Sequence, residues 1–437
     1  MALNKAPYKG TQDFFPAQMR LRNYVFDKMS EISEHFAYEP YDGPLLEEVE
    51  LYMAKSGEEL INDQIYSFID RGDRKVAIRP EMTPTVARMA AQVHREVTKP
   101  FRWYAIPNLM RYEKPQKGRL REFWQYNADI FGAPEGLGEI EILQLAVGIM
   151  KGLGATHEHF EILLNDRRLV DNIFQKLFCL SPEEAKKLYK VADKVKKIDE
   201  TAIKKMTALI ITDDKKAELF YQYLKLDNFT DLKMFLQQHD LMADSQDFLT
   251  FVNRLEKFAL TTYVKFDPSI VRGLDYYTGV VFEIFDKHPE NRRAIAGGGA
   301  YANLLQIFNE PALPGVGFGL GLVTLTDFLT THKLLPDLVK ASVDVLMAYI
   351  SPAAEQECFM LAQKIRSFGI STELMFGETK PKKAFTQAEK KHYRFIVLMG
   401  DEEMNKNEVQ IKNLETREQQ NVSIQDMEKI TRIFKGN

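Results

Sequence analysis

Apolar residues change their spacing along the chain, and each spacing predicts a different kind of element. After Pro16 they recur at steps of three and four residues, which predicts an amphipathic helix. From about residue 41 to residue 132, short β-type runs alternate with turn signals such as the Arg-Gly-Asp-Arg of residues 71–74, which predicts strands. Beyond residue 341, strand and helix patterns alternate, which predicts a small α/β domain with a mainly parallel sheet.

A long stretch without glycine interrupts the strand-rich part of the chain. No glycine occurs between Gly154 and Gly273, and residues 170–260 are rich in Leu, Lys, Ala and Phe. Within this stretch Ser181 and Pro182 precede two acidic residues, which is the pattern of a capped helix start. We therefore expect a helical insertion. Its alternating charge is typical of a solvated helical module, and a specific binding role is the alternative.

The charge balance limits the functions that the chain can have. Among 437 residues, 58 Lys and Arg face 62 Asp and Glu, a formal net charge of −4. Nucleic-acid binding by bulk charge is excluded, so any such contact must come from local basic clusters. Cys179 and Cys358 lack CxxC spacing, which excludes a disulfide framework or a thiolate zinc site. With no visible targeting segment or membrane-length apolar run, we expect a cytoplasmic protein that contacts no membrane.

Polar residues alternate along a predicted strand–loop–strand unit at residues 100–132. Alternate residues of a strand share a face, so Arg111 and Glu113 are expected on one face of the first strand. Buried polar groups need partners, so the polar face of the second strand predicts a polar ligand or, alternatively, an exposed edge hairpin. That second face consists of Gln125, Asn127 and Asp129.

The loop between these strands is strongly basic. Residues 99–122 hold seven basic side chains and two acidic ones, a local charge of +5. In a chain of net charge −4 this loop is the natural place for phosphate, and a solvated charged loop is the alternative.

Two further motifs combine charged and hydroxyl groups. Residues 271–279, Val-Arg-Gly-Leu-Asp-Tyr-Tyr-Thr-Gly, suit a small charged or aromatic ligand, although a packed hairpin would read the same way. Residues 79–84 hold Glu81 and Thr83 between two prolines, where both can accept hydrogen bonds from an ammonium group. The glycine runs at 297–299 and 315–321 permit close approach of a ligand but match neither a P-loop nor a dinucleotide fingerprint. The histidines show no metal-ligand spacing.

These motifs resemble the class II aminoacyl-tRNA synthetases, and among them the histidyl-tRNA synthetase family, over nearly the whole chain. Residues 111–125 resemble motif 2, residues 272–279 closely match the histidine-specific signature, and residues 38–44 resemble the end of motif 1. The resemblance implies an α+β fold with an antiparallel catalytic sheet flanked by helices. Its implied parts are a catalytic domain (residues 1–169 and 261–335), the helical insertion (170–260) and an α/β anticodon-binding domain (341–437).

The resemblance also implies an activity and a role for each matched residue. The activity is that of a histidine–tRNA ligase, which uses ATP with Mg²⁺ to activate L-histidine and then charges tRNA(His), as a homodimer joined through motif 1. Arg111 and Arg272 would be catalytic at the α-phosphate, where fixed cations stabilise developing charge. Histidine would be bound by Glu81, Thr83, Gln125, Asp129, Tyr276 and Tyr277, ATP by Arg111, Glu113 and Arg272, and tRNA by Lys114, Gln116, Lys117 and Arg119, with no resident metal site.

Charges that the family carries are absent at four positions. Motif 3 of the family usually ends in Gly-Leu-Glu-Arg, where residues 321–324 read Gly-Leu-Val-Thr. The family's Gly-Gly-Arg-Tyr-Asp reads Gly-Gly-Ala-Tyr-Ala at residues 298–302. Because Thr324, Ala300 and Ala302 are uncharged, we expect weakened nucleotide binding beside a complete histidine pocket.

Two alternatives to the enzyme follow from these departures. One is a histidine-binding regulatory protein that resembles the regulatory subunit of ATP phosphoribosyltransferase. The other is a tRNA sensor without catalysis. The close match at residues 272–279 and the anticodon-type domain favour the enzyme.

Overall fold

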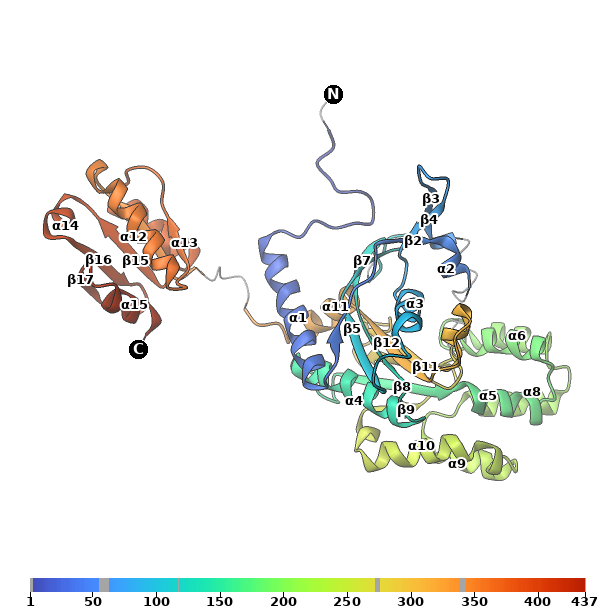
Figure 1. The fold of residues 1–437 in the computed structure, drawn as a ribbon. Helices are drawn as coiled ribbons and strands as arrows, with labels where there is room; N and C mark the ends of the chain where they lie inside the picture. Colours follow the sequence, from blue (N-terminus) through green and yellow to red (C-terminus); the bar gives the residue numbers. More distant parts are fainter. Residues whose placement is uncertain (1–2, 55–62, 117, 272–275, 338–342, 437) are drawn as a thin grey trace. The chain divides into compact units, whose positions relative to one another are not determined.

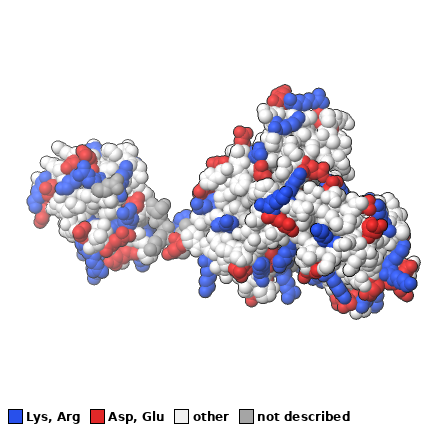
Figure 2. Space-filling model, turned by 90° about the horizontal axis from the view of Figure 1, so that it is seen from below, with Lys and Arg blue, Asp and Glu red and all other residues white. Residues whose placement is uncertain are grey.

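A computed structural model describes residues 3–54, 63–116, 118–271, 276–337 and 343–436. The chain folds into two compact units, residues 1–335 and 336–437, each with a core of its own (Figure 1). Among the described residues, no helix is long and apolar enough to cross a membrane. On the face of the molecule seen in Figure 2, acidic and basic side chains are interspersed, as the near balance of charge leads one to expect.

A large, mainly antiparallel sheet forms the centre of the first unit. β1 pairs with β5 and β8 with β9 in parallel, and the other neighbours are antiparallel. The order is β1 (Glu39–Pro40), β5 (Phe101–Ala105), β7 (Glu122–Phe131), β12 (Gly315–Gly321), β11 (Ala296–Tyr301), β10 (Val280–Asp286), β8 (Phe160–Asp166) and β9 (Val264–Phe266), with β6 (Asn108–Met110) also paired to β7. The antiparallel catalytic sheet that the resemblance implies is therefore confirmed.

The two faces of this sheet are covered differently. One face carries the main apolar core beneath α1 (Pro16–His35), α4 (Leu137–Gly152) and α11 (Leu322–Thr331). On the other face, apolar side chains of α3 (Thr83–Val93) pack with aromatic residues of the sheet, among them Phe131 and Tyr301. α1 is the helix that the apolar spacing after Pro16 predicts. Figure 1 shows α3 lying over part of this second face.

A small sheet stands beside α3. β2 (Leu46–Glu48), β4 (Lys75–Ile78) and β3 (Tyr66–Ile69) pair antiparallel, and α2 (Val49–Met53) follows β2. The turn signals at residues 71–74 connect β3 to β4, as the sequence predicts. Leu46, Phe68 and Ile69 of this sheet are exposed.

Helices occupy the stretch in which the sequence predicts a helical insertion. They are α5 (Arg167–Lys176), α6 (Pro182–Ala192), α7 (Glu200–Ala208), α8 (Asp214–Leu224), α9 (Phe229–Gln238) and α10 (Gln246–Lys257). Ser181 caps α6 as predicted, since the Glu184 N–H donates to its hydroxyl and its own N–H donates to the Glu184 carboxylate.

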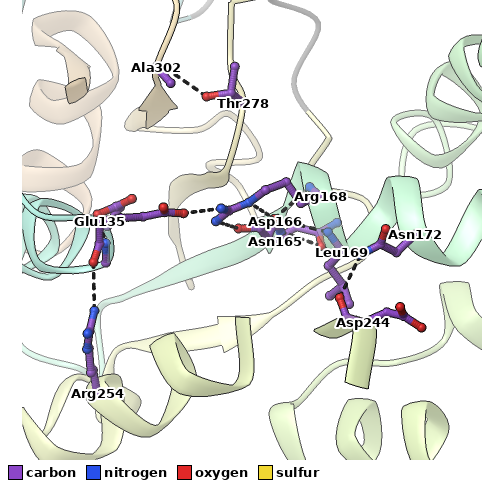
Figure 3. A network of polar contacts seen from close by, with 12 residues as sticks. Glu135, Asn165, Asp166, Arg168, Leu169, Asn172, Asp244, Arg254, Thr278 and Ala302 are labelled. Carbon is purple, nitrogen blue, oxygen red and sulfur yellow. Dashed lines mark hydrogen bonds and ion pairs between the residues drawn. The ribbon is translucent and has the colours of Figure 1, made fainter. Parts of the chain in front are cut away.

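A polar network ties the insertion to the catalytic sheet (Figure 3). Arg168, at the start of α5, forms ion pairs with Asp166 at the end of β8 and with Glu135 before α4. Arg254 of α10 donates to the backbone carbonyl of Glu135 at 3.0 Å. Glu135, between β7 and α4, is therefore the point to which helices from both ends of the insertion are bound.

The second unit is only partly the parallel sheet that the sequence predicts. β14 (Thr372–Leu374), β13 (Val345–Tyr349) and β15 (Phe395–Met399) are parallel, with α12 (Glu355–Ser367) and α13 (Pro381–Lys391) between them. A hairpin of β16 (Glu408–Asn413) and β17 (Gln419–Ser423) then extends the sheet antiparallel, flanked by α14 (Asp401–Lys406) and α15 (Met427–Lys435). The sequence pattern misses this hairpin because few of its residues are buried, mainly Val409, Ile411 and Val422.

Candidate active site

Glycines clear the sheet surface on which the polar side chains lie. Gly317 of β12 pairs with Asp129 of β7, and a Cβ at Gly317 would lie 2.2 Å from Asp129 Oδ1. A Cβ at Gly319 would lie 2.8 Å from Gln125 Nε2, and one at Gly299 would lie 2.7 Å from the ring of Tyr277. Only a residue without a side chain leaves this space, so the glycine runs serve the side chains of the site.

Asp129 is the buried carboxylate of this surface. It accepts a hydrogen bond from the Tyr301 hydroxyl, which reaches it from β11. Burial raises the pKa of Asp129 to about 7, and the Tyr301 hydrogen bond opposes part of that rise. The Tyr41 hydroxyl is buried nearby without a hydrogen-bond partner among the described residues, and burial followed by the charge of Asp129 raises its pKa.

A second carboxylate lies where α3 begins. Glu81 is buried just before Thr83, the first residue of α3. The Tyr276 hydroxyl lies 3.4 Å from a Glu81 carboxylate oxygen and 3.4 Å from the Thr83 hydroxyl. The Tyr276 and Tyr277 rings are 4.7 Å apart between centroids, and both are buried. The structure therefore brings the motif at residues 79–84 to the motif at residues 271–279.

Arg111 and Glu113 do not share a strand face, so that prediction is wrong. β6 ends at Met110, and only the Arg111 N–H continues the pairing, by donating to the Arg121 carbonyl at 2.8 Å. The chain then turns toward Pro115, which cannot donate to a strand ladder. Both residues therefore lie on the loop that follows β6.

The loop after β6 is nevertheless held to the rest of the site. Arg111 Nε donates to the carbonyl of Pro80 at 2.9 Å, next to Glu81, and its guanidinium lies 5.4 Å from the centroid of the Phe123 ring. Glu113 is buried and forms an ion pair with Arg119. Lys114 and Gln116 are exposed on the same loop. Arg272 and Lys117, which the sequence also proposes, lie outside the described residues.

The uncharged positions lie at two separate places, towards the two ends of β12, and each place has an arginine nearby. Ala300 and Ala302 line a cavity of about 270 Å³ together with Arg168. Ala302 N–H donates to the Thr278 hydroxyl at 3.0 Å (Figure 3). Thr324 Oγ1 donates to the Gly321 carbonyl at 3.1 Å, and Arg293 lies beside it.

Three residues of this surface have no role in the sequence analysis: Tyr41, Tyr301 and Arg293. Tyr301 stands between the two alanines that drew attention only for the charges they lack, and its contact with Asp129 spans 172 residues of sequence. No local pattern predicts such a contact. The described ranges contain no group of three or more His, Cys, Asp or Glu side chains that could hold a metal ion.

Comparison with known proteins covers both units. The family model described as histidyl-tRNA synthetase matches residues 10–325, and the one described as anticodon binding domain matches residues 344–432. The chain is 42% identical over 416 residues to the histidine–tRNA ligase of Leptospira biflexa, which covers 94% of each chain. It is 35% identical over 427 residues to the chloroplastic/mitochondrial histidine–tRNA ligase of Arabidopsis thaliana, covering 97% of this chain and 86% of that one.

A solved structure shares the fold. The histidyl-tRNA synthetase of Nostoc sp. PCC 7120 superposes with a TM-score of 0.81 at 23% identity, covering 99% of this chain and all of that one. The antiparallel sheet, its helical cover and the strand–loop–strand unit around Arg111 are the catalytic architecture of a class II aminoacyl-tRNA synthetase. Within that class, the family is shown by the extent of both family-model matches and by the sequence identity to the Leptospira protein. The chain belongs to the histidyl-tRNA synthetase family.

Proposed function

We propose that the chain is an active histidine–tRNA ligase of class II, which forms histidyl-adenylate from histidine and ATP and then charges tRNA(His). The observation that carries this function is the assembly of the pocket on one face of the sheet. Glu81, Asp129, Tyr276 and Tyr301 come from segments far apart in sequence and meet in two hydrogen-bonded groups. A histidine-binding regulatory protein would also need this pocket but not the anticodon binding domain matched at residues 344–432, and a tRNA sensor would need no amino-acid pocket, so these alternatives are not favoured.

The two carboxylates suit the two ends of a histidine molecule. In this proposal Glu81 and Thr83, together with Gln125, bind the α-ammonium group, for which carboxylate, hydroxyl and amide oxygens are acceptors. Asp129 and Tyr277 bind the two imidazole nitrogens. A neutral imidazole has one N–H donor and one acceptor nitrogen, so an acceptor and a hydroxyl together distinguish it from an apolar ring of similar size.

The first chemical step places charge at phosphorus. An oxygen of the histidine carboxylate attacks the α-phosphorus of ATP, the bond from that phosphorus to the bridging oxygen breaks, and pyrophosphate leaves with the bonding electrons. We assign Arg111 and Arg272 to the α-phosphate oxygens, where they stabilise the negative charge of the transition state. In the second step a ribose hydroxyl of the tRNA end attacks the carbonyl carbon, and AMP leaves.

Mg²⁺ belongs to this reaction as the partner of ATP. Glu113 is the acidic residue that sequence and structure place on the motif 2 loop, and it is paired with Arg119. Since the described residues contain no group of three or more His, Cys, Asp or Glu that could hold an ion, Mg²⁺ would keep phosphate oxygens and water as most of its ligands, which is the usual coordination of this ion with nucleotides.

The tRNA would meet both units. We assign Lys114, Gln116, Lys117 and Arg119 to its acceptor end. In the second unit, Lys380, Lys382, Lys383, Lys390 and Lys391 of α13 and its N-terminus line an open groove. Lys391 is already paired with Glu373 at 2.7 Å, so the other lysines are the better candidates for the phosphates of the anticodon arm.

Replacing lysines on α13 tests the anticodon assignment. Neutralising Lys382, Lys383 and Lys390 with glutamine should raise the KM for tRNA about tenfold, lower its salt dependence and leave adenylate formation unchanged. The matched control carries glutamine at Lys429 and Lys435 of α15, which are exposed in the same unit. Equal effects of the two sets of changes would contradict the assignment.

We also propose a homodimer. Exposed apolar side chains gather in and next to the small sheet that follows the motif 1 segment: Leu45, Leu46, Met53, Phe68 and Ile69. Light scattering on the full chain tests this assignment, with Phe68→Glu and Ile69→Glu as the combined variant that should give monomers. A wild-type protein that is monomeric at micromolar concentration would contradict it.

Histidine-dependent exchange of pyrophosphate into ATP is the test of the function as a whole. The full chain should catalyse the exchange with histidine and not without it, and Arg111→Ala should abolish the exchange. Lys114→Ala is the matched control, since it should slow transfer to tRNA while leaving the exchange unchanged. A well-folded chain that binds histidine but shows no exchange would contradict the function.

A further inference from the structure

An arginine from outside the family's motifs stands where motif 3 lacks one. Arg293 lies on the segment between β10 and β11, and its side chain approaches the tip of the motif 2 loop at Gly118. A Cβ on Gly118 would lie 3.1 Å from Arg293 Cδ and 3.7 Å from Thr324 Cγ2. Arg293 and Thr324 therefore flank the same point of that loop, although 31 positions separate them in sequence.

Hydrogen bonds hold the segment of Arg293 to the start of α11. The carbonyl of Ile295 accepts from the Gly321 N–H at 3.1 Å and from the Thr324 hydroxyl at 3.4 Å. The Ile295 N–H donates to the Ile284 carbonyl of β10 at 2.7 Å. Arg293 is two residues from this anchor, so its place relative to Thr324 is set by the backbone and not by its side chain alone.

The charges around Arg293 do not balance. Glu113 is paired with Arg119, and Arg293 has no hydrogen bond or ion pair within the part of the chain that the structure describes. Burial, and next the Arg119 guanidinium, lower the pKa of Arg293 from its ordinary value, while Glu113 opposes them. The guanidinium groups of Arg119 and Arg293 thus lie near one carboxylate, that of Glu113. The remaining positive charge favours binding of an anion here.

We propose that Arg293 binds the triphosphate of ATP and supplies the cation that motif 3 lacks at Thr324. This inference rests on the proposed function, which identifies the anion as a nucleotide. A guanidinium can serve a phosphate from any backbone position that brings it within hydrogen-bond distance, because the interaction depends on charge and on two parallel donors. The relocation explains how the threonine in motif 3 is compatible with an active enzyme.

Replacing Arg293 separates this inference from the function it rests on. Arg293→Ala should raise the KM for ATP in pyrophosphate exchange about ten- to a hundredfold, with the KM for histidine within about threefold of wild type. Arg293→Lys should lose less, since lysine keeps the positive charge but lacks the two parallel N–H donors of the guanidinium. Arg292→Ala is the matched control, because Arg292 is the exposed neighbour on the same segment and should have no effect.

Direct titration with MgATP provides a measurement that does not depend on catalysis. Arg293→Ala should weaken the binding of MgATP to the full chain by the same factor, even if wild-type exchange were absent and the function itself therefore wrong. Equal affinities of Arg293→Ala and Arg292→Ala would overturn the inference. So would a raised KM for tRNA with an unchanged KM for ATP, which would make Arg293 a tRNA contact.

Restoring the motif 3 arginine in the variant completes the test. Thr324→Arg in the Arg293→Ala background should recover at least part of the lost ATP affinity, since either residue can place a guanidinium beside Gly118. The same Thr324→Arg change in the wild-type background should not improve affinity, because Arg293 already occupies the place. If Thr324→Arg improved ATP affinity in the wild-type background but not in the Arg293→Ala variant, Arg293 would not be the substitute for the motif 3 arginine.

Discussion

The two ends of the site, which we assign to histidine and to the nucleotide, are built in different ways. Asp129 and Tyr301, at the histidine end, project from strands of the sheet and are buried. The Asp129 carboxylate packs so closely over Gly317 that any other residue there would displace it. At the nucleotide end, Arg111 lies on the loop after β6 and Arg293 on another segment between strands, and both are partly exposed. One end is a rigid pocket, and the other is a set of charges on loops.

The difference follows from what each end has to recognise. An imidazole is told from other rings by single hydrogen bonds, which discriminate only when buried groups are held in place and would otherwise stay unpaired. A triphosphate carries several charges, and attraction to it falls slowly with distance. The element that supplies an arginine can therefore differ at the nucleotide end, as Arg293 beside Thr324 illustrates, whereas the buried pocket around Asp129 depends on fixed positions.

The largest effect should come from the buried carboxylate. Asp129→Ala removes the acceptor for the imidazole N–H and leaves the Tyr301 hydroxyl without its partner, so we expect histidine binding to weaken about a thousandfold. Calorimetric titration with histidine measures the change. MgATP affinity should stay within about threefold, because the nucleotide end does not depend on Asp129.

Asp129→Asn is the companion variant, since it keeps the shape of the side chain and removes its charge. Burial raises the pKa of Asp129 above its ordinary value, so the ionised carboxylate destabilises the free protein as pH rises from about 4 through about 7. The asparagine variant should therefore be more stable than wild type at about pH 8 and bind histidine poorly. Unchanged histidine binding in either variant would remove Asp129 from the pocket.

The second-largest effect should come from adding a methyl group at Gly317, the glycine opposite Asp129. Gly317→Ala would place a Cβ 2.2 Å from Asp129 Oδ1 and 2.7 Å from the Ala128 carbonyl, so β7 must shift. We expect a loss of roughly 1–3 kcal/mol in the free energy of unfolding and a ten- to hundredfold rise, in order of magnitude, in the KM for histidine. Urea denaturation and exchange kinetics measure the two quantities.

Gly321→Ala is the control for this variant in the same strand. Its Cβ would meet Thr324 Oγ1 at 3.3 Å as nearest neighbour, a contact that a small shift of this side chain relieves, so the KM for histidine should change little. If the two alanine variants behaved alike, the glycines would not be shaping the histidine pocket.

A smaller, pH-dependent effect on the KM for histidine should follow from removing the Tyr301 hydroxyl, which donates to Asp129. The Tyr301 hydrogen bond lowers the pKa of Asp129, so Tyr301→Phe should move that pKa above about 7. The ionised carboxylate accepts the imidazole N–H more strongly than the protonated one, so we expect the KM for histidine to fall as pH rises through the pKa of Asp129. The fall should occur near pH 7 in wild type and at higher pH in the variant, with a difference of roughly tenfold near pH 7 and little near pH 9.

The KM profile of the Tyr301→Phe variant has an internal check. A tyrosine that only fills space would change the KM by the same factor at every pH, and the profile would keep its midpoint. That result would leave Tyr301 as a packing residue and the histidine end less tightly specified than we infer.

The smallest effect should come from rebuilding motif 3. Val323→Glu with Thr324→Arg restores the family's charges, yet Arg293 already stands beside residue 324, so we expect the KM for ATP to stay within about threefold of wild type. Pyrophosphate exchange measures it. A tenfold improvement would mean that the nucleotide end of the wild-type chain is deficient, as the sequence comparison by itself predicts.

Periodic patterns predict much of the fold correctly. The helix after Pro16, the capped start of α6 and the alternation of Gln125, Asn127 and Asp129 are local matters of spacing, and the structure confirms them. The strand through Arg111 and Glu113 and the hairpin of β16 and β17 were mispredicted or missed. Pro115 interrupts the first strand, and the hairpin has too few buried residues to show an alternating apolar pattern.

What the sequence by itself determined is the kind of protein and most of the polar groups of its site. Alternation along β7, glycine runs and short motifs are properties of neighbouring residues, and they are enough to name a family. The tertiary structure alone decided that Tyr301 serves Asp129 and that Arg293 stands beside Thr324. Those contacts arise where strands and loops distant in sequence pack together, and their distances depend on the register of a whole sheet rather than on any local pattern.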